Sequence, residues 1–512
     1  MDDDGSPGGD DRSPGGDDRS PGGDDRSPGG DDVSSGADAD SPERDGGSSD
    51  GDADSPERDG GSSDGDADSP DSGLVDEIAR GGGLGFLGRL GGKGLSVLVQ
   101  VLMTRYLGPT RYGLFVLGQS VARIGQRLAQ LGLDQGVLRY GSVYEGDDRR
   151  LGGLVGTTLV VSLLGSAVVA VAVYAFAGSI ATVVFDDPAL EPVVRAFVLA
   201  IPFYVLFELV GAYFQAFRRI GTQQLLTSVF RQVANLVLVG GAFLLGFRLY
   251  GAIGGFVLTS VLGTLVGGYL LFAAPSAPLS VGQVGGALDE RREVLSFSAQ
   301  MMVVAMSFLL ATRMDRIMLG ILSTTESVGV YNVAAMVAFQ FSIVLSSLIS
   351  IFKPVIADVS DAGDTERVRE LYETVAKWAT FGTVPPYVVV VLFATPVLSV
   401  FGSAFTAARP VLYVLPLMYL VGCVTGPCGA LLSMSGRQRL EVGNQTVLVV
   451  LNAVLNLLLI PVYGAVGAAA AVVLAGAVTN ALQLGFVYAI YGFHPFHREH
   501  LLLTIATAAV VA

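Results

Sequence analysis

The sequence is poor in charged residues and in cysteine. Its 512 residues contain only 15% Asp, Glu, Lys and Arg, and only two cysteines. A soluble chain carries about 25% charged residues, so most of this chain is not expected to face water. The two cysteines, in CVTGPC from Cys423 to Cys428, match neither a redox CxxC pair nor a zinc knuckle. We interpret both as small packing residues in a helix.

The sequence also lacks the motifs of common enzymes. No Walker A loop, nucleophile elbow, HExxH zinc motif or pair of loop acids is present. The three histidines lie in HPFHREH, from His494, which we interpret as a solvated loop rather than a metal site. We therefore expect a protein that is not an enzyme, with no metal and no cofactor. The start of the chain lacks the basic segment of a cleavable signal, so the first apolar helix is expected to direct insertion.

Most of the acidity is confined to the first 72 residues. This segment has 24 acidic residues and 5 arginines, whereas the rest has 27 basic and 23 acidic residues. It repeats the units SPGGDDR and DADSPERDGGSSDG. Such Gly-, Ser- and Asp-rich sequence buries too little apolar surface to offset its chain entropy, so we predict disorder. Solvation of the protein and docking of a basic partner are two alternative roles.

The remainder consists of apolar runs of roughly membrane length, which is about 20 helical residues. We predict twelve transmembrane helices, over 84–105, 113–134, 151–177, 195–217, 224–246, 250–272, 295–321, 328–352, 375–400, 409–434, 441–462 and 464–491. Two sets of six helices are a common transporter plan, with the site between the halves. The predicted fold is all-α, a polytopic membrane protein with two six-helix bundles around a central cavity. The predicted domains are a tail (1–72), two bundles (80–275 and 295–512) and a cytoplasmic linker (276–294).

The distribution of basic residues predicts the orientation in the membrane. Alternate loops on one side contain 14 Lys and Arg residues, against 5 on the other side. The richer side is expected to be cytoplasmic, which places the N-terminus there in a multi-pass plasma-membrane protein. The last apolar run, residues 500–512, is too short to cross a bilayer. We expect a partial thirteenth helix of a chain that lacks its final helices.

Several predicted spans contain ionisable residues, which are costly in hydrocarbon and usually face a cavity. Basic residues outnumber carboxylates among them, and a guanidinium suits phosphate. The acids Glu208 and Asp315 are candidates for ion coupling. Each has a structural alternative: Glu208 neutralises Arg231, and Asp315 forms an ion pair with a neighbouring arginine. Snorkelling to the cytoplasmic surface is the alternative to a cavity role for Arg89, Lys93 and Arg127. The substrate-binding candidates are Arg89, Lys93, Arg123, Arg127, Arg313 and Arg316.

Five strings together resemble a known family. They are TRYLGPTRYGLF from Thr104, LGLDQGVLRYGS from Leu131, RMDRIMLGILSTTESVGVYNVA from Arg313, FKPVIADV with DTERVRELYETVAKW from Phe352, and LNAVLNLLLIPVYGAVGAAAA from Leu451. In this order they resemble polysaccharide flippases of the Wzx (RfbX) type. These belong to the multidrug/oligosaccharidyl-lipid/polysaccharide exporter superfamily. The resemblance runs from about residue 80 to the end and excludes the tail.

The resemblance implies a monomeric flippase that moves a polyprenyl- or dolichyl-phosphate-linked oligosaccharide outward for surface polysaccharide or glycoprotein assembly. It implies cavity arginines that bind the lipid phosphate, which on matching positions are Arg89, Lys93, Arg123 and Arg313, with Arg316 next. Na⁺ or H⁺ coupling and contact with glycan-assembly enzymes are further hypotheses; nucleic acid is not an expected partner. The alternatives are a cation antiporter of the same superfamily and a membrane glycosyltransferase or ligase that uses Asp186 and Asp187.

Overall fold

The computed structural model describes residues 70–273, 291–361 and 364–496, with side chains from Gly92 onward. These residues form helices and no strands. The predicted tail, most of the linker 276–294 and the last apolar run lie outside the described residues. The first part contains α1 (Pro70–Gln130), α2 (Leu133–Val143), α3 (Asp148–Ser179), the π-helix η1 (Ile180–Val184), α4 (Leu190–Val198), α5 (Ala200–Ala216), α6 (Ile220–Gln224), the π-helix η2 (Leu225–Phe230), α7 (Arg231–Leu244) and α8 (Leu249–Phe272).

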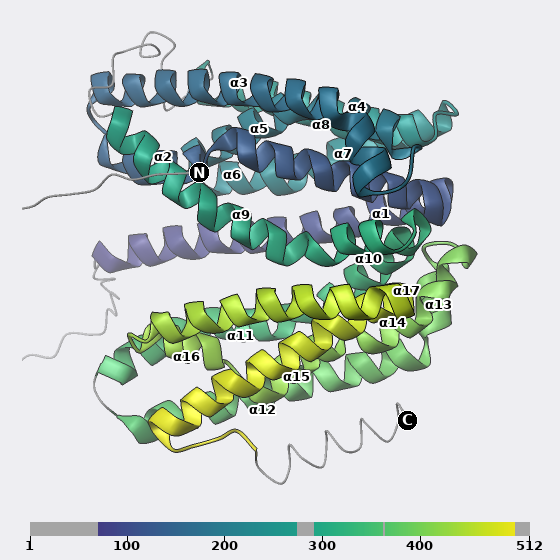
Figure 1. Cartoon of the computed structure of the whole chain (residues 1–512). Helices are drawn as coiled ribbons and strands as arrows, with labels where there is room; N and C mark the ends of the chain where they lie inside the picture. The colour runs from purple at the N-terminus through teal and green to yellow at the C-terminus, as the bar shows by residue number, and fades with distance from the viewer. Residues whose placement is uncertain (1–69, 274–290, 362–363, 497–512) are drawn as a thin grey trace, which may run out of the picture. The chain divides into compact units, whose positions relative to one another are not determined.

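The second part follows residue 290. It contains α9 (Arg291–Leu322), α10 (Thr325–Phe339), α11 (Ser342–Asp361), α12 (Thr365–Leu392), α13 (Ala394–Ser399), the 3-10 helix η4 (Ser403–Ala408), α14 (Arg409–Val414), α15 (Leu417–Thr425), α16 (Cys428–Met434) and α17 (Gln438–Tyr491). Figure 1 shows α11, α12, α15, α16 and α17 grouped together, while α9 and α10 lie beside α1.

Seven of the described helical segments are long and apolar enough to cross a membrane, or up to nine if each bent pair is one span. The longest helices each combine two expected spans. In α1 the backbone leaves the helical region at Gly108 (φ 70°, ψ 173°), directly before Pro109. In α17 it does so at Gly464 (φ 54°, ψ −129°), three residues after Pro461. Positive φ suits glycine, and proline cannot continue a hydrogen-bond ladder. The total of twelve spans stays a prediction.

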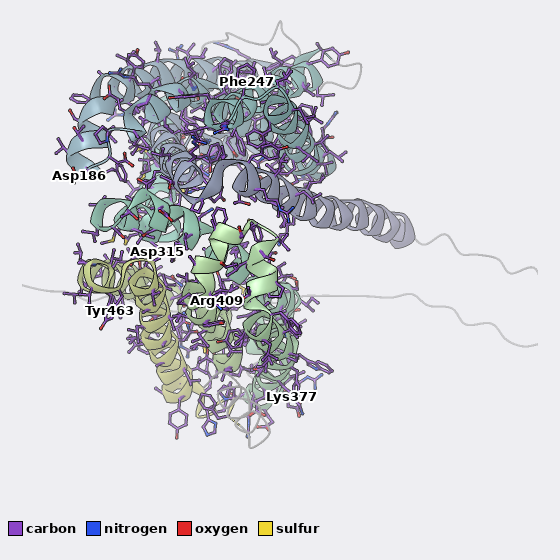
Figure 2. All side chains as sticks on the ribbon, turned by 90° about the vertical axis from the view of Figure 1, so that its right-hand side faces the viewer. Asp186, Phe247, Asp315, Lys377, Arg409 and Tyr463 are labelled. Carbon is purple, nitrogen blue, oxygen red and sulfur yellow. The ribbon has the colours of Figure 1, made fainter. Side chains whose placement is uncertain are left out.

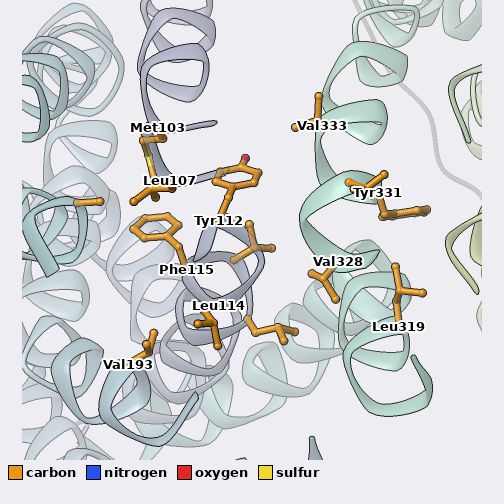
Figure 3. Packing of buried hydrophobic residues seen from close by; sticks show 14 of the residues in the cluster. Met103, Leu107, Tyr112, Leu114, Phe115, Val193, Leu319, Val328, Tyr331 and Val333 are labelled. Carbon is orange, nitrogen blue, oxygen red and sulfur yellow. The ribbon is translucent and has the colours of Figure 1, made fainter. Parts of the chain in front are cut away.

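The two expected halves meet where the second part of α1 contacts α10. A Cβ atom on Gly113 would lie 1.9 Å from the Thr325 carbonyl oxygen, and one on Gly329 would lie 2.2 Å from that of Pro109. Only glycine allows two helix backbones to approach this closely. Around this contact, one apolar core draws on both halves, including Met103 and Phe115 of α1, Leu319 of α9 and Tyr331 of α10 (Figure 3).

Polar side chains reinforce the same contact. Asn332 of α10 donates a hydrogen bond to the Tyr112 hydroxyl of α1 at 2.7 Å, and that hydroxyl donates to Gln100 Oε1 at 2.6 Å. The Thr325 hydroxyl donates to the Asp187 carboxylate, which joins the start of α10 to the turn before α4. Buried polar groups are stable only when they are hydrogen-bonded, so these pairs hold α1 and α10 in a defined register.

Candidate functional site

An arginine pair shares one carboxylate inside the first half. Arg123 of α1 and Arg231 of α7 lie 3.7 Å and 3.6 Å from Glu208 Oε1 of α5. Both distances exceed the range of about 2.7–2.9 Å for a charge-assisted hydrogen bond. The Arg123 guanidinium also donates to Gln126 Oε1 at 2.8 Å and lies 4.4 Å from the centre of the Tyr204 ring. A single carboxylate therefore balances two positive charges.

Helix α9 adds two more arginines to this region. Arg313 interacts electrostatically with Arg316, Arg123 and Tyr204. Among the described residues, Arg313 has no hydrogen-bond or ion-pair partner within the usual distances, and the buried Arg316 Nε has no hydrogen-bond acceptor. Arg316 Nη1 donates to the Thr312 carbonyl of its own helix at 3.3 Å. We call Arg123, Arg231, Arg313, Arg316 and Glu208 the arginine cluster.

The charge and exposure of the arginine cluster suit an anionic ligand. It has four guanidinium groups, and among the described residues Glu208 is its only acid within 4.0 Å of a guanidinium. The side chains of Arg123 and Arg231 keep 22% and 31% of their surface exposed, so a polar ligand can reach them. Each guanidinium offers five N–H donors in a planar fork that matches phosphate oxygens.

Asp315 lies between Arg313 and Arg316 in sequence but has neutral hydrogen-bond partners. Its Oδ2 accepts from the Tyr331 hydroxyl of α10 at 3.3 Å, and its Oδ1 accepts from Asn456 of α17 at 3.2 Å. Figure 2 shows Asp315 on α9 near the α17 ribbon. Within the described part of the chain it has no ion pair within 4.0 Å, but it interacts electrostatically with Arg316, so the expected offset of one arginine charge acts without direct contact.

The other candidates lie apart from the arginine cluster or cannot be placed. Arg127 Nη1 contacts Asp134 Oδ2 at 3.4 Å and Gln130 Oε1 at 3.3 Å, at the end of α1 and the start of α2. Lys93 of α1 is exposed. Arg89 belongs to α1, but its side chain lies outside those described. Of the six binding candidates, the structure brings together Arg123, Arg313 and Arg316.

Two residues of this region, Tyr204 and Asn456, were not considered from the sequence, whereas Arg231 pairs with Glu208 as one sequence alternative expected. Tyr204 lies against Arg123, and Asn456 binds Asp315 while also donating to Asn452 Oδ1 at 2.9 Å. Asn452 and Asn456 are four residues apart and both buried. Their spacing puts two amides on one face of an apolar span, which is the signal that could have identified them.

Asp187 and the two cysteines, which were considered for enzymatic or metal chemistry, lie in defined surroundings. Asp187 accepts the Ala189 backbone N–H at 3.0 Å and the Thr325 hydroxyl. Cys423 and Cys428 are buried thiols on separate short helices, because the backbone breaks at Gly426 between α15 and α16. No group of three or more His, Cys, Asp or Glu side chains suited to a metal occurs in the described residues.

Comparison with known proteins shows to which family the chain belongs. The family described as polysaccharide biosynthesis protein matches residues 78–360. This chain belongs to that family. It is a Wzx-type member of the multidrug/oligosaccharidyl-lipid/polysaccharide exporter superfamily, as the sequence resemblance predicted. The match covers more than half of the chain and includes every residue of the arginine cluster.

Individual relatives agree with the family assignment. The chain is 23% identical over 410 residues to the probable low-salt glycan biosynthesis flippase Agl15 of Haloferax volcanii, with 78% of this chain and 82% of Agl15 aligned. The solved structure of the lipid II flippase MurJ in an inward closed conformation superposes with a TM-score of 0.63 at 13% identity. That superposition covers 86% of this chain and 97% of MurJ.

A second solved structure has the same fold. It is an inward-facing MATE family multidrug transporter, with a TM-score of 0.53 at 16% identity, covering 81% of this chain and 98% of the transporter. At these identities the structural likeness shows the fold alone. The predicted all-α, polytopic membrane fold is therefore confirmed, and the family's relatives are flippases and transporters.

Proposed function

We propose that this protein translocates a lipid-linked oligosaccharide, carried on a polyprenyl or dolichyl phosphate, across the cytoplasmic membrane. The observation that carries the proposal is the arginine cluster within predicted membrane spans: Arg123 and Arg231 share Glu208 and, among the described residues, Arg313 lies in the field of Arg123 and Arg316 with no acid in contact. Uncompensated positive charge at this depth is costly, and an anionic ligand would offset that cost. The phosphate that joins a lipid to a glycan supplies this charge.

The family and its relatives support the same substrate class. Agl15 is named as a glycan biosynthesis flippase, and the family is described by polysaccharide biosynthesis. In our proposal the flipped glycan then serves surface polysaccharide or glycoprotein assembly, with the N-terminus in the cytoplasm. The protein acts as a monomeric transporter and not as an enzyme.

The mechanism follows from the charges on each helix. The lipid phosphate binds between Arg123 and Arg313, which belong to α1 and α9 on opposite sides of the expected division between the halves. Glu208 offsets part of the charge of Arg123 and Arg231 until the phosphate arrives and competes with it for these arginines. The glycan stays in the polar interior while the lipid tail remains in the bilayer. Reorientation of the halves then exposes the phosphate on the outer side.

Ion coupling is the second element of the proposal. Asp315 is an acid whose hydrogen-bond partners are neutral Tyr331 and Asn456, while Arg316 acts on it without direct contact, so protonation or Na⁺ binding would change its charge without breaking an ion-pair contact. Glu208, which already contacts two arginines, is the weaker candidate. The carboxylate of Asp315 also favours the alternative function, a cation antiporter of the same fold, in which this acid and not the arginines would be essential.

The test is the sidedness of lipid-linked oligosaccharide in a strain that lacks this protein. We expect the glycan to accumulate on the cytoplasmic face, and a wild-type copy to restore its export. Copies with Arg123→Ala or Arg313→Ala should fail to restore export at equal protein level. The control is Arg195→Ala, because Arg195 pairs with Glu191 at 2.7 Å on α4, outside the arginine cluster. Normal sidedness in the deletion strain would overturn the proposal in favour of the antiporter.

A further inference from the structure

The tenth predicted span is broken in its middle. Helix α15 ends at Thr425, Gly426 adopts φ 82° and ψ −168°, and α16 begins at Cys428 after Pro427. The Tyr372 hydroxyl of α12 donates to the Thr425 carbonyl oxygen that the break leaves without a helical partner. In membrane transporters, broken helices of this kind commonly border a ligand site, so the surroundings of this break are a candidate site.

A polar pocket of about 310 Å³ lies beside the break. It is lined by Gly426 and Gly429 from the broken span and by polar side chains from α11, α16 and α17. These helices lie side by side in Figure 1. Its polar lining includes Lys353, Ser433, Glu441, Gln445, Asn480 and Gln483. None of these residues belongs to the arginine cluster.

Glu441 is the centre of this lining. Its Oε1 accepts a hydrogen bond from Gln445 Nε2, and its Oε2 accepts one from Gln483 Nε2, both at 2.7 Å. A Cβ atom on Gly429 would lie only 3.1 Å from both Glu441 oxygens and from Gln483 Nε2. Because Gly429 has no side chain, the Glu441 carboxylate and the Gln483 amide can lie against its backbone.

The orientation of these groups identifies the ligand chemistry. A bound metal cation needs several oxygen ligands directed at it, but here two amide N–H groups already point at the carboxylate. Lys353 and Glu441 balance each other in charge, which favours an uncharged ligand. Hydroxyl groups fit, because each can donate to a carboxylate or amide oxygen and accept from an amide or ammonium N–H. A sugar is a small ligand that carries several hydroxyl groups on one ring, so it matches this lining.

We propose that this pocket binds one sugar residue of the lipid-linked glycan through its hydroxyl groups. The inference rests on the proposed flippase function and adds a glycan site in the second half to the phosphate site of the arginine cluster. The pocket volume lies at the small end of the range of about 300–1,000 Å³ for ligand sites. One sugar unit is therefore held, and the rest of the oligosaccharide lies outside the pocket.

The experiment compares two probes on the purified full chain in lipid nanodiscs. One probe is polyprenyl phosphate, and the other is polyprenyl phosphate that carries a single hexose. We expect the hexose to tighten binding to the wild type about tenfold, a typical gain for hydrogen bonds to a charged group. Glu441→Gln and Gly429→Ala should abolish this gain and leave the affinity for polyprenyl phosphate unchanged.

The matched control is Gly443→Ala. Gly443 lies on α17, and a Cβ atom added there would meet nothing within 4 Å, so it tests the same chemical change without filling the pocket. We expect it to keep the tenfold gain. The thermal unfolding temperature of each variant in the nanodisc should equal that of the wild type. Glu441→Gln removes the charge, whereas Gly429→Ala fills space in the pocket, so the two variants test the site independently.

The remaining outcomes separate this inference from the proposed function. An equal affinity of the wild type for both probes, or a gain that persists in both test variants, overturns the sugar site alone. A change in Na⁺ or pH dependence without a change in the sugar gain would likewise overturn it in favour of an ion site. Binding of the hexose probe that depends on Glu441, without binding of polyprenyl phosphate, supports the sugar site and contradicts the phosphate site. No binding of either probe overturns both.

Discussion

The arginine cluster and the polar pocket beside α16 differ in how their charged groups are compensated. In the cluster, Arg123 and Arg231 share Glu208 at distances longer than good hydrogen bonds, and Arg313 has no acid partner among the described residues. In the pocket, the Glu441 carboxylate is held by two neutral amides at 2.7 Å. The first region carries excess positive charge, whereas the second presents a hydrogen-bonded acid near a lysine.

We infer from this difference that the two regions bind different parts of one substrate. A phosphate removed from water needs compensating positive charge and hydrogen-bond donors, and guanidinium groups supply both. A sugar is neutral and needs a dense set of donors and acceptors. A lipid-linked glycan contains both groups on one molecule, so one substrate can use both regions.

The largest expected effect is that of Arg313→Ala. Loss of a hydrogen bond to a charged group costs about 1.5–3 kcal/mol, so binding of bare polyprenyl phosphate should weaken by about ten- to a hundredfold. Equilibrium binding in nanodiscs measures this change, with Arg195→Ala as the control. An unchanged affinity would show that Arg313 does not bind the phosphate. It would contradict the claim that the arginine cluster recognises the phosphate by its excess positive charge.

Asp315→Asn separates ion coupling from binding. The asparagine keeps an acceptor for Tyr331 or Asn456 but cannot change charge. Because coupling between two sites is typically worth about 5–150-fold, we expect at least about a fivefold loss of translocation driven by a Na⁺ or proton gradient in proteoliposomes. Affinity for polyprenyl phosphate should stay the same. A variant that still responds fully to the gradient would exclude Asp315 as the coupling acid.

Glu208→Gln should have a smaller effect with the opposite sign on phosphate affinity. Partly exposed ion pairs contribute about 0.2–1 kcal/mol, so removing the acid that competes for Arg123 and Arg231 should tighten polyprenyl phosphate binding by up to about fivefold. The measurement is the same binding titration at low and high salt. Weaker binding would mean that Glu208 mainly positions the two arginines.

Deletion of residues 1–72 should have the smallest effect. The tail lies outside the matched family region, which starts at residue 78. Export of lipid-linked glycan by the truncated chain in the deletion strain should equal that of the full chain at the same protein level. Loss of export would favour the alternative in which the tail docks a partner.

Much of the helical arrangement could be predicted from hydropathy, but the break inside the expected span 409–434 could not. The expected spans 84–105 and 113–134 lie on either side of the Gly108–Pro109 break, while the expected single span 409–434 is divided among α14, α15 and α16. A sliding apolar window averages over one glycine and one proline. The Gly426–Pro427 pair in CVTGPC carried the signal for the second break.

The candidate site was predicted in part for a similar reason. Charged residues in apolar spans are conspicuous, and this identified Arg123, Arg313 and Arg316. Contacts between residues far apart in sequence depend on tertiary packing and were not predicted: Glu441 meets Gln483 across 42 residues of the chain, and Asp315 meets Asn456 across 141 residues. Glu441 stands at the start of a predicted span, where an acid is ordinarily solvated, so nothing in the local sequence distinguishes it.

The most direct test of the central claim is translocation by purified protein in liposomes. The substrate is polyprenyl phosphate that carries a short glycan, and the readout is the fraction of glycan that becomes accessible to a glycosidase outside. We expect wild type and Arg195→Ala to expose glycan at equal rates, and Arg123→Ala with Arg313→Ala to reduce the rate to that of empty liposomes. Translocation at the wild-type rate by the double variant would contradict the claim that the arginine cluster carries the lipid phosphate across the membrane.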